Sequence, residues 1–250
     1  MKMETIDKKT IGNYVAEDFR TAALFSKYGI DFCCKGNRTL TEACEKKTIS
    51  PEVLENEINA ILNTANDQSI DFKSWPLDLL VDYIEKTHHR YVEEKSGVLY
   101  KFLDKLCKVH GGRHPELFEI NKLFIAGAGV LAKHMMKEEL ILFPFIKRMA
   151  QTKGKSIDMP NFGTVDNPIA MMEDEHTIEG ERFRKIAELT NNYTPPEDAC
   201  ETYKVTFAML KEFEEDLHKH IHLENNILFP AAKTLEKKFT VSGNLSHSLL

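Results

Sequence analysis

The sequence has no long hydrophobic run, no regular cysteine framework and no cluster of basic residues. No apolar stretch among its 250 residues approaches the ~20 residues of a membrane span, and the polar start MKMETIDKKT is unlike a signal peptide. Five cysteines, an odd number without regular spacing, argue against a secreted disulfide scaffold. A net charge of -6 argues against nucleic-acid binding. We therefore predict a cytoplasmic protein with no nucleic-acid or membrane partner.

Strand alternation is also missing, and helical punctuation takes its place in the amino-terminal quarter. Apolar residues recur at helical spacing over residues 11–28. Thr39 and Glu42 have the spacing of a capping box, and Ser50-Pro51 predicts the start of a helix that ends near residue 62. These short segments predict a small helical domain.

Four longer helical patterns follow, and the TPPE sequence at residues 194–197 supplies capping signals for the last of them. Helices joined by short loops predict an all-α, up-down-up-down four-helix bundle. The four helices are expected at about 76–108, 115–150, 166–190 and 194–237. The predicted organisation is a small helical domain at 1–65, a linker at 66–75, the bundle at 76–240 and a disordered tail at 241–250.

The bundle region contains an internal repeat. HMMKEELILFP at residues 134–144 returns as HIHLENNILFP at residues 220–230, with the His, the Glu four residues later and the final Ile-Leu-Phe-Pro unchanged. Residues four apart project from the same helix face, and here that face is the apolar one. A buried ionised carboxylate needs a positive partner, and a metal cation supplies one. The final Pro is read as a kink or a helix end beside core packing.

The other two helices each offer a His for the same site. His176 lies on the apolar stripe of the third helix, and the first helix offers His88 or His89, of which the repeat spacing slightly favours His89. Counted from the helix ends, these residues and the two repeated pairs lie at one level of an antiparallel bundle. They are therefore expected to converge.

Four His and two Glu from four helices exceed the needs of one metal ion. We predict a site for two ions, with Glu138 and Glu224 as bridging carboxylates and two His on each side. Mixed imidazole and carboxylate ligands suit iron, with manganese and zinc left open. The order His-x-x-x-Glu differs from the Glu-x-x-His pairs of ferritin-like sites.

At this point the sequence resembles a known family. The second half resembles hemerythrin-like di-iron bundles, and residues 8–235 as a whole resemble the repair-of-iron-centres family. The motifs that carry this resemblance are DFCCKGNRTL (31–40), HMMKEELILFP, MEDEH (172–176) and HLENNILFP (222–230). The resemblance implies two iron ions on His89, His134, Glu138, His176, His220 and Glu224, with Glu175 beside them.

The family resemblance implies repair of iron–sulfur clusters damaged by nitric oxide or oxidants, with iron–sulfur proteins as partners. The alternatives are reduction of nitric oxide at the same di-iron site, which would make the protein an enzyme, and a sensor that binds nitric oxide or oxygen. Oxygen-carrying hemerythrins use five His, whereas this stripe has four, and His218 and His222 are expected to point elsewhere. A homodimer is left open.

Cys33 and Cys34 are the second chemical feature. Adjacent cysteines close only a strained disulfide, so free thiols or a transient redox pair are expected. Lys35 and the helix beginning near Thr39 are expected to lower a thiol pKa. Packing in a tight domain is the alternative, but the resemblance favours thiols that handle iron or nitric oxide. The remaining cysteines, expected only to pack, are Cys44, Cys107 and Cys200.

Overall fold

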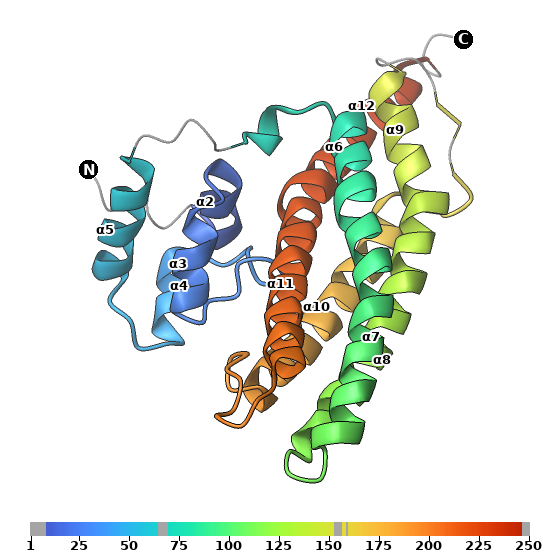
Figure 1. Cartoon of the computed structure of the whole chain (residues 1–250). Helices are drawn as coiled ribbons and strands as arrows, with labels where there is room; N and C mark the ends of the chain where they lie inside the picture. The colour runs from blue at the N-terminus through green and yellow to red at the C-terminus, as the bar shows by residue number, and fades with distance from the viewer. Residues whose placement is uncertain (1–8, 65–69, 153–156, 159, 247–250) are drawn as a thin grey trace.

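The structure, a computed structural model, describes all residues except 1–8, 65–69, 153–156, 159 and 247–250. Its amino-terminal part is a group of short helices on one side of the molecule (Figure 1). They are α2 (Ile11–Glu17), α3 (Thr21–Lys27), α4 (Leu40–Glu45) and α5 (Pro51–Leu62). The predicted capping box of α4 is confirmed, because Thr39 and Glu42 exchange both hydrogen bonds.

The continuous helix predicted over residues 11–28 is wrong. The chain breaks at Asp18, whose carboxylate accepts hydrogen bonds from the backbone N–H and the guanidinium of Arg20, each at 3.0 Å. The Thr21 hydroxyl donates to the Asp18 carbonyl at 2.8 Å. Asp and Thr side chains that bond nearby backbone groups compete with a continuous helix, and here they start a second one.

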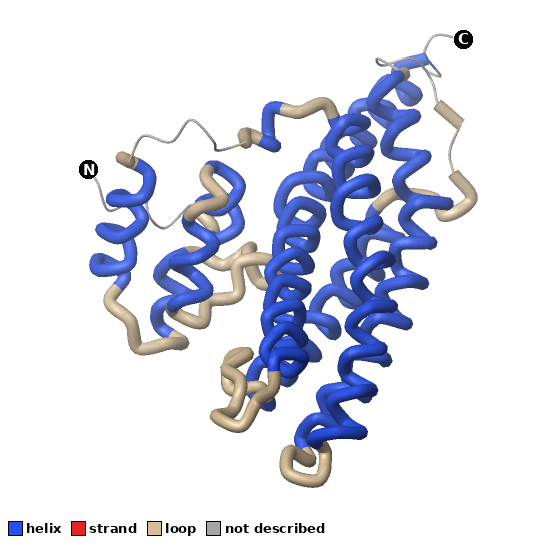
Figure 2. Tube along the Cα trace, in the orientation of Figure 1, coloured by secondary structure: helices blue, strands red, loops and turns tan. Residues whose placement is uncertain are grey.

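Four long helical rods form the bundle, and Figure 2 shows helices and loops but no strands in the part that the structure describes. Consecutive rods pack against each other and the fourth packs against the first, as expected for an up-down-up-down bundle, and α9 of the second rod also contacts α12 of the fourth. A short 3₁₀ turn (η1, Phe72–Ser74) precedes the first rod. The first rod consists of α6 (Leu77–Tyr83), η2 (Ile84–His89) and α7 (Arg90–His110), and the second of α8 (Glu116–Lys137), η3 (Glu138–Leu142) and α9 (Phe143–Gln151). The third rod is α10 (Asp166–Leu189). The fourth consists of α11 (Glu201–Leu223), η4 (Glu224–Leu228) and α12 (Phe229–Ser246).

The fourth rod differs from its prediction at both ends. It begins at Glu201, because residues 196–199 form a turn in which the Ala199 N–H donates to the Pro196 carbonyl at 3.0 Å, and Cys200 after it is extended. At the other end α12 continues to Ser246, into the segment predicted to be a disordered tail. Residues 247–250 of that tail, and 65–69 at the start of the predicted linker, lie outside the described residues.

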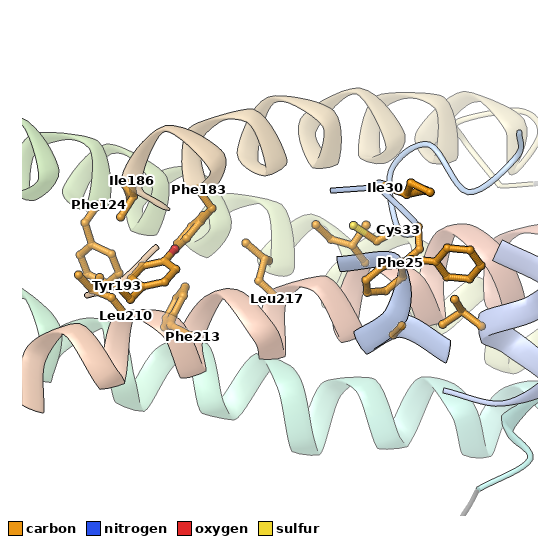
Figure 3. Close-up of a cluster of buried hydrophobic side chains, with 14 of the residues drawn as sticks. Phe25, Ile30, Cys33, Phe124, Phe183, Ile186, Tyr193, Leu210, Phe213 and Leu217 are labelled. Carbon is orange, nitrogen blue, oxygen red and sulfur yellow. The ribbon is translucent and has the colours of Figure 1, made fainter. Parts of the chain in front are cut away.

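The apolar core is divided into two clusters. One includes Phe124, Phe183 and Phe213 of the bundle and continues into Phe25 and other residues of the small helices (Figure 3). The other fills the opposite end of the bundle and contains the final Leu-Phe of both repeats. A layer of buried His and Glu residues lies between the two clusters along the rods.

Close backbone contact joins the small helices to the bundle. The side chain of Asn226, on η4, lies against Gly12 and Gly36, where an added Cβ would approach its Oδ1 to 2.1 Å and 2.5 Å. The Asn226 amide donates to the carbonyls of Cys33 and Phe32, at 3.1 Å and 3.4 Å. Only glycine leaves room for this contact.

Within the described residues, every helix is too short or too polar to cross a membrane.

Candidate metal centre

Three of the four rods widen into a π-helical turn at the predicted site. These turns are η2, η3 and η4. In the two repeats the bonding is the same: the N–H of Phe143 donates to the carbonyl of Glu138, and the N–H of Phe229 donates to that of Glu224. π turns inside α-helices are frequent at functional sites, where they change the direction of side chains.

The wide turns also explain the repeated Ile-Leu-Phe-Pro. Proline has no N–H to donate, and in a regular α-helix its ring clashes with the carbonyl four residues earlier. Pro144 and Pro230 both lie two residues after the last residue of a π turn, and α9 and α12 continue beyond them. The prolines therefore do not end the rods, and they favour the wide turn that begins at each predicted bridging Glu.

The structure brings all six predicted ligands together. Their donor atoms form two groups of four, each within 4.8 Å of one another, and Glu138 and Glu224 belong to both. His89 and His220 complete one group, and His134 and His176 complete the other. This is the arrangement expected of two cation positions that share two carboxylates. All six side chains are buried.

The imidazoles all direct Nε2 toward the shared carboxylates. His89 and His134 each place Nε2 3.4 Å from Glu138 Oε2, and His176 places it 3.1 Å from Glu224 Oε2. The Nε2 atoms of His134 and His176 are 3.0 Å apart. Nitrogen atoms that approach each other and a carboxylate this closely are aimed at a common centre, as ligands of a cation are.

Three of the four buried carboxylate oxygens of the site lack a hydrogen-bond partner in the part of the chain that the structure describes. Neither carboxylate oxygen of Glu138, nor Oε2 of Glu224, accepts a hydrogen bond from a described residue. Burial lowers the pKa of His134, but the nearby negative charge of Glu138 outweighs it and raises that pKa to about 9. Burial raises the pKa of Glu224, yet His220 and His176 hold it well below its usual range. The carboxylates thus require positive charge at the position where metal ions would lie, so the residues fit a metal.

Three of the four imidazoles are held from outside by a second hydrogen bond at Nδ1. His89 Nδ1 lies 2.9 Å from Glu139 Oε1, and His134 Nδ1 lies 2.8 Å from Glu175 Oε2. His176 Nδ1 donates in the same way to Asn225 Oδ1 at 2.8 Å. Such partners fix the tautomer and the direction of the ring so that Nε2 faces the metal. His220 Nδ1 is buried without a partner in the described part of the chain.

Sequence reasoning missed two of these outer partners, although the repeat contains the signal. Glu139 and Asn225 both directly follow a bridging Glu, at equivalent positions of the two repeats. Each bonds the His of a neighbouring rod. Glu175, predicted beside the site, contacts His134 rather than its neighbour in sequence and also forms an ion pair with Lys137 at 2.5 Å.

The neighbouring histidines point away from the donor groups. His88 places Nδ1 2.8 Å from Asp216 Oδ1 and stacks on His220, so its place is outside both groups while His89 lies inside. His222 packs against Phe19 and Phe32, and His218 also packs against Phe32, as helical phase predicts.

Both the small helical part and the bundle match models of known protein families. The hemerythrin HHE cation binding domain matches residues 81–232, and the ScdA_N model, described as a domain of unknown function, matches residues 7–62. The iron-sulfur cluster repair protein ScdA of Staphylococcus haemolyticus is 34% identical over 210 residues, 84% of this chain and 90% of that protein. The chain belongs to the iron–sulfur cluster repair family of hemerythrin HHE proteins.

Two further members of this family give the same coverage. Iron-sulfur cluster repair protein YtfE of Escherichia coli is 36% identical over 213 residues, 85% of this chain and 91% of that protein, and YtfE of Shigella boydii serotype 4 gives the same values. The match to the HHE domain includes all six predicted ligands. The family domain binds cations, and this chain has buried His/Glu groups that can hold a metal.

The cysteines of this family member differ in part from expectation. Cys33 and Cys34 are free thiols with sulfurs 3.7 Å apart. The predicted lowering of a thiol pKa is wrong for Cys33, because its hydrogen bond with Cys34 and its burial raise that pKa well above its usual value. Cys44 and Cys107 are buried as predicted, but Cys200 is exposed, with its sulfur 3.3 Å from His110 Nε2.

A cavity of about 660 Å³ lies between the cysteine loop and the bundle, and it gives a pH-dependent prediction. Burial raises the pKa of Glu214, on its wall, to about 7. The folded protein therefore binds a proton at the Glu214 carboxyl more tightly than the unfolded chain does. As a result, the free energy of unfolding falls as pH rises from about 4.5 to 7. Glu214→Gln should increase the free energy of unfolding by on the order of 2 kcal/mol more at pH 8 than at pH 5.

Urea unfolding at the two pH values measures this effect. The matched control is Glu215→Gln, which removes the same charge from the adjacent exposed position. An equal change for Glu214→Gln at both pH values would contradict the assignment of the raised pKa to this carboxyl.

Proposed function

We propose that this protein holds two iron ions between its His and Glu residues and supplies iron to iron–sulfur clusters damaged by nitric oxide or oxidants. Relatives that match most of the chain are named iron-sulfur cluster repair proteins. The observation that carries the proposal is the pair of donor groups with two shared carboxylates. A protein that only packed four helices would have no use for two buried carboxylates with three oxygens that accept no hydrogen bond from a described residue.

Each iron would be held by two imidazoles and by the shared Glu138 and Glu224. His89 and His220 belong to one position, and His134 and His176 to the other. Mixed nitrogen and oxygen ligands with open coordination positions suit iron. The absence of thiolate from these two donor groups is consistent with iron that can leave again.

The surrounding residues would keep the six donors in place while iron enters and leaves. Glu139, Glu175 and Asn225 orient three of the imidazoles from outside. The first two of these are in turn held by Arg90, at 2.7 Å, and by Lys137. When bound, the iron pair would supply labile ferrous iron. The protein's part is to bind this iron and to keep the six ligand side chains in the right orientation.

We also propose that the protein works in the cytoplasm, with iron–sulfur proteins as its clients. Cys33 and Cys34 would handle iron or nitric oxide between the small helices and the bundle. The position of Cys34 supports this, because its sulfur lies 3.3 Å from the carbonyl oxygen of His176.

The test begins with iron content after anaerobic loading. We expect two iron ions per chain, one for each donor group, and a near-complete loss in the His134→Ala, Glu138→Ala double variant. His114→Ala is the matched control, because His114 pairs with Glu116 and Asp198 away from the donor groups. Loaded wild type should then restore a cluster in an apo iron–sulfur protein given sulfide, whereas the double variant should not.

Two outcomes would overturn the proposal. One is a single zinc ion per chain that is unaffected by the double variant, which would place the bound metal elsewhere. The other is tight retention of both irons in the presence of the apo protein, with no cluster formed, which would remove the transfer function.

A further inference from the structure

A third set of metal-binding side chains lies outside the His/Glu centre, in the loop before α4. The donor atoms of Asp31, Cys33 and Cys34 lie within 4.8 Å of one another. Cys33 Sγ is 3.5 Å from Asp31 Oδ1 and 3.7 Å from Cys34 Sγ. Cys33 is buried, whereas Cys34 and Asp31 are partly exposed.

These separations match the edges of a tetrahedral metal site. With bonds of about 2.3 Å to sulfur and about 2.1 Å to oxygen, tetrahedral angles place two sulfurs roughly 3.8 Å apart and a sulfur and an oxygen roughly 3.6 Å apart. The observed distances of 3.7 Å and 3.5 Å agree with both. A disulfide would instead need the sulfurs at about 2.05 Å. Two of the three edges thus match a cation site, and the third, from Cys34 Sγ to the Asp31 carboxylate, is within 4.8 Å.

Hydrogen bonds hold the loop in this form. Asp31 Oδ1 accepts from the N–H groups of Cys34, at 3.0 Å, and Lys35, at 3.3 Å, which closes a turn and places the carboxylate beside the sulfurs. Arg184 lies 3.5 Å from Asp31 Oδ2. The loop is thus preorganised, and little movement separates it from a ligand set.

The remaining coordination position faces the cavity of about 660 Å³, which all three residues line. Five basic side chains share that lining with the carboxylates of Asp31, Glu214 and Glu215. They are Lys35, Arg38, Lys47, Arg184 and Lys211. An excess of basic groups attracts an anionic fourth ligand to the cation, such as a cysteine thiolate of a client protein.

The loop is also in contact with the His/Glu centre. Cys34 Sγ donates to the carbonyl oxygen of His176 at 3.3 Å. The Asn225 amide donates to the Cys33 carbonyl at 3.4 Å, while its oxygen faces His176 Nδ1. A cation on the loop would therefore be bound by a cysteine, Cys34, that is in direct contact with the predicted iron ligand His176.

We propose that Asp31, Cys33 and Cys34 bind one thiophilic divalent cation, Fe²⁺ in the cell, as a staging position between the cavity and the His/Glu centre. Binding forms two metal–thiolate bonds and releases two protons to solvent, with no change of oxidation state. One of these protons is the one that Cys34 shares with His176. The staging role depends on the proposed repair function, whereas cation binding by the loop does not.

The test uses the full chain, first loaded anaerobically with two equivalents of iron, enough for the His/Glu centre alone, and then titrated with Co²⁺. We expect one equivalent of cobalt to bind with the near-ultraviolet charge-transfer absorption of cobalt–thiolate bonds, and with release of two protons. Cys33→Ser, Cys34→Ser should lose this absorption and keep its iron. Asp31→Asn should weaken cobalt binding by roughly tenfold or more, since even outer contacts of a ligand contribute 10- to 100-fold.

The matched control is Cys200→Ser, which removes an exposed thiol elsewhere and should leave the absorption unchanged. Retained iron and an unchanged far-ultraviolet circular dichroism spectrum show that each variant is folded. The proposal is overturned if wild type gives no thiolate absorption, or if the absorption survives in Cys33→Ser, Cys34→Ser. Failure of the proposed repair function would appear separately, as missing iron in the first loading step.

Discussion

Replacing Glu138 and Glu224 together by Gln is expected to abolish metal binding and yet to make the metal-free protein at least as stable as metal-free wild type. Both carboxylates belong to both donor groups, so their loss removes two oxygen ligands from each position. Removing the metal from saturated wild type with a chelator should therefore lower its free energy of unfolding by on the order of 4 kcal/mol. The same treatment should leave the free energy of unfolding of the double variant unchanged.

The second half of this expectation follows from burial. In the absence of a cation, Glu138 and Glu224 are fully buried, and imidazoles are their only neighbours of opposite charge among the described residues: His134 and His89 for Glu138, and His220 and His176 for Glu224. Replacing both partners of a buried ion pair by neutral groups is often stabilising, by about 1–4 kcal/mol, and the histidines become neutral as well when their carboxylate partners are replaced. A Gln amide can also donate to a neutral imidazole, which a carboxylate cannot.

Urea unfolding with and without a chelator, together with metal content, measures both halves. Glu181→Gln is the matched control, because it removes the same charge from an exposed position of α10. A metal-free double variant that unfolds at much lower urea than metal-free wild type would show that these carboxylates stabilise the fold by themselves, against the metal interpretation.

The arrangement of the six donors could be predicted from the sequence because it depends on two robust quantities. One is the spacing of four residues between His and Glu, which places both on a single helix face. The other is the distance of each residue from its helix end, which places the residues of antiparallel rods at one level. Both quantities tolerate an error of one or two residues in a helix boundary.

The π turns could not be predicted in the same way. A π turn adds one residue to a helical turn and shifts the apolar face beyond it by one position, and a regular period continued through Glu138 and Glu224 does not reveal this shift. The choice of His89 over His88 depends on such a turn, because η2 ends at His89 and sets the direction of both rings. Spacing between repeats gave only a slight preference there.

Local hydrogen bonds and tertiary contacts explain the other differences between the predicted and the observed structure. The break at Asp18 arises from side-chain hydrogen bonds that the apolar pattern of residues 11–28 does not reveal. The start of α11 depends on the turn closed by the Ala199 N–H and the Pro196 carbonyl, which takes the place of the helical turn predicted from the capping signal. The outer partners Glu139 and Asn225 require knowledge of which rod lies next to which, and this is tertiary information.

Asn225 gives the second large prediction. Asn225→Ala is expected to weaken iron binding by roughly 10- to 100-fold, because His176 loses the acceptor of its Nδ1 proton and with it the fixed direction of Nε2. Asn225→Asp should retain most of the affinity, since a carboxylate fills the same role beside His89 and His134. Competition with a chelator of known affinity, at constant pH, measures the dissociation constants.

Asn226→Ala separates this effect from loosening of the cysteine loop. Asn225 and Asn226 both donate to the Cys33 carbonyl, but only Asn225 contacts His176. Asn226→Ala should therefore weaken the contact between the small helices and the bundle while iron affinity stays near that of wild type. If both variants lost iron affinity equally, the position of the loop would control the metal centre and the imidazole hydrogen bond would not. A loss confined to Asn225→Ala would instead assign to this residue the part that Glu139 has in the first repeat.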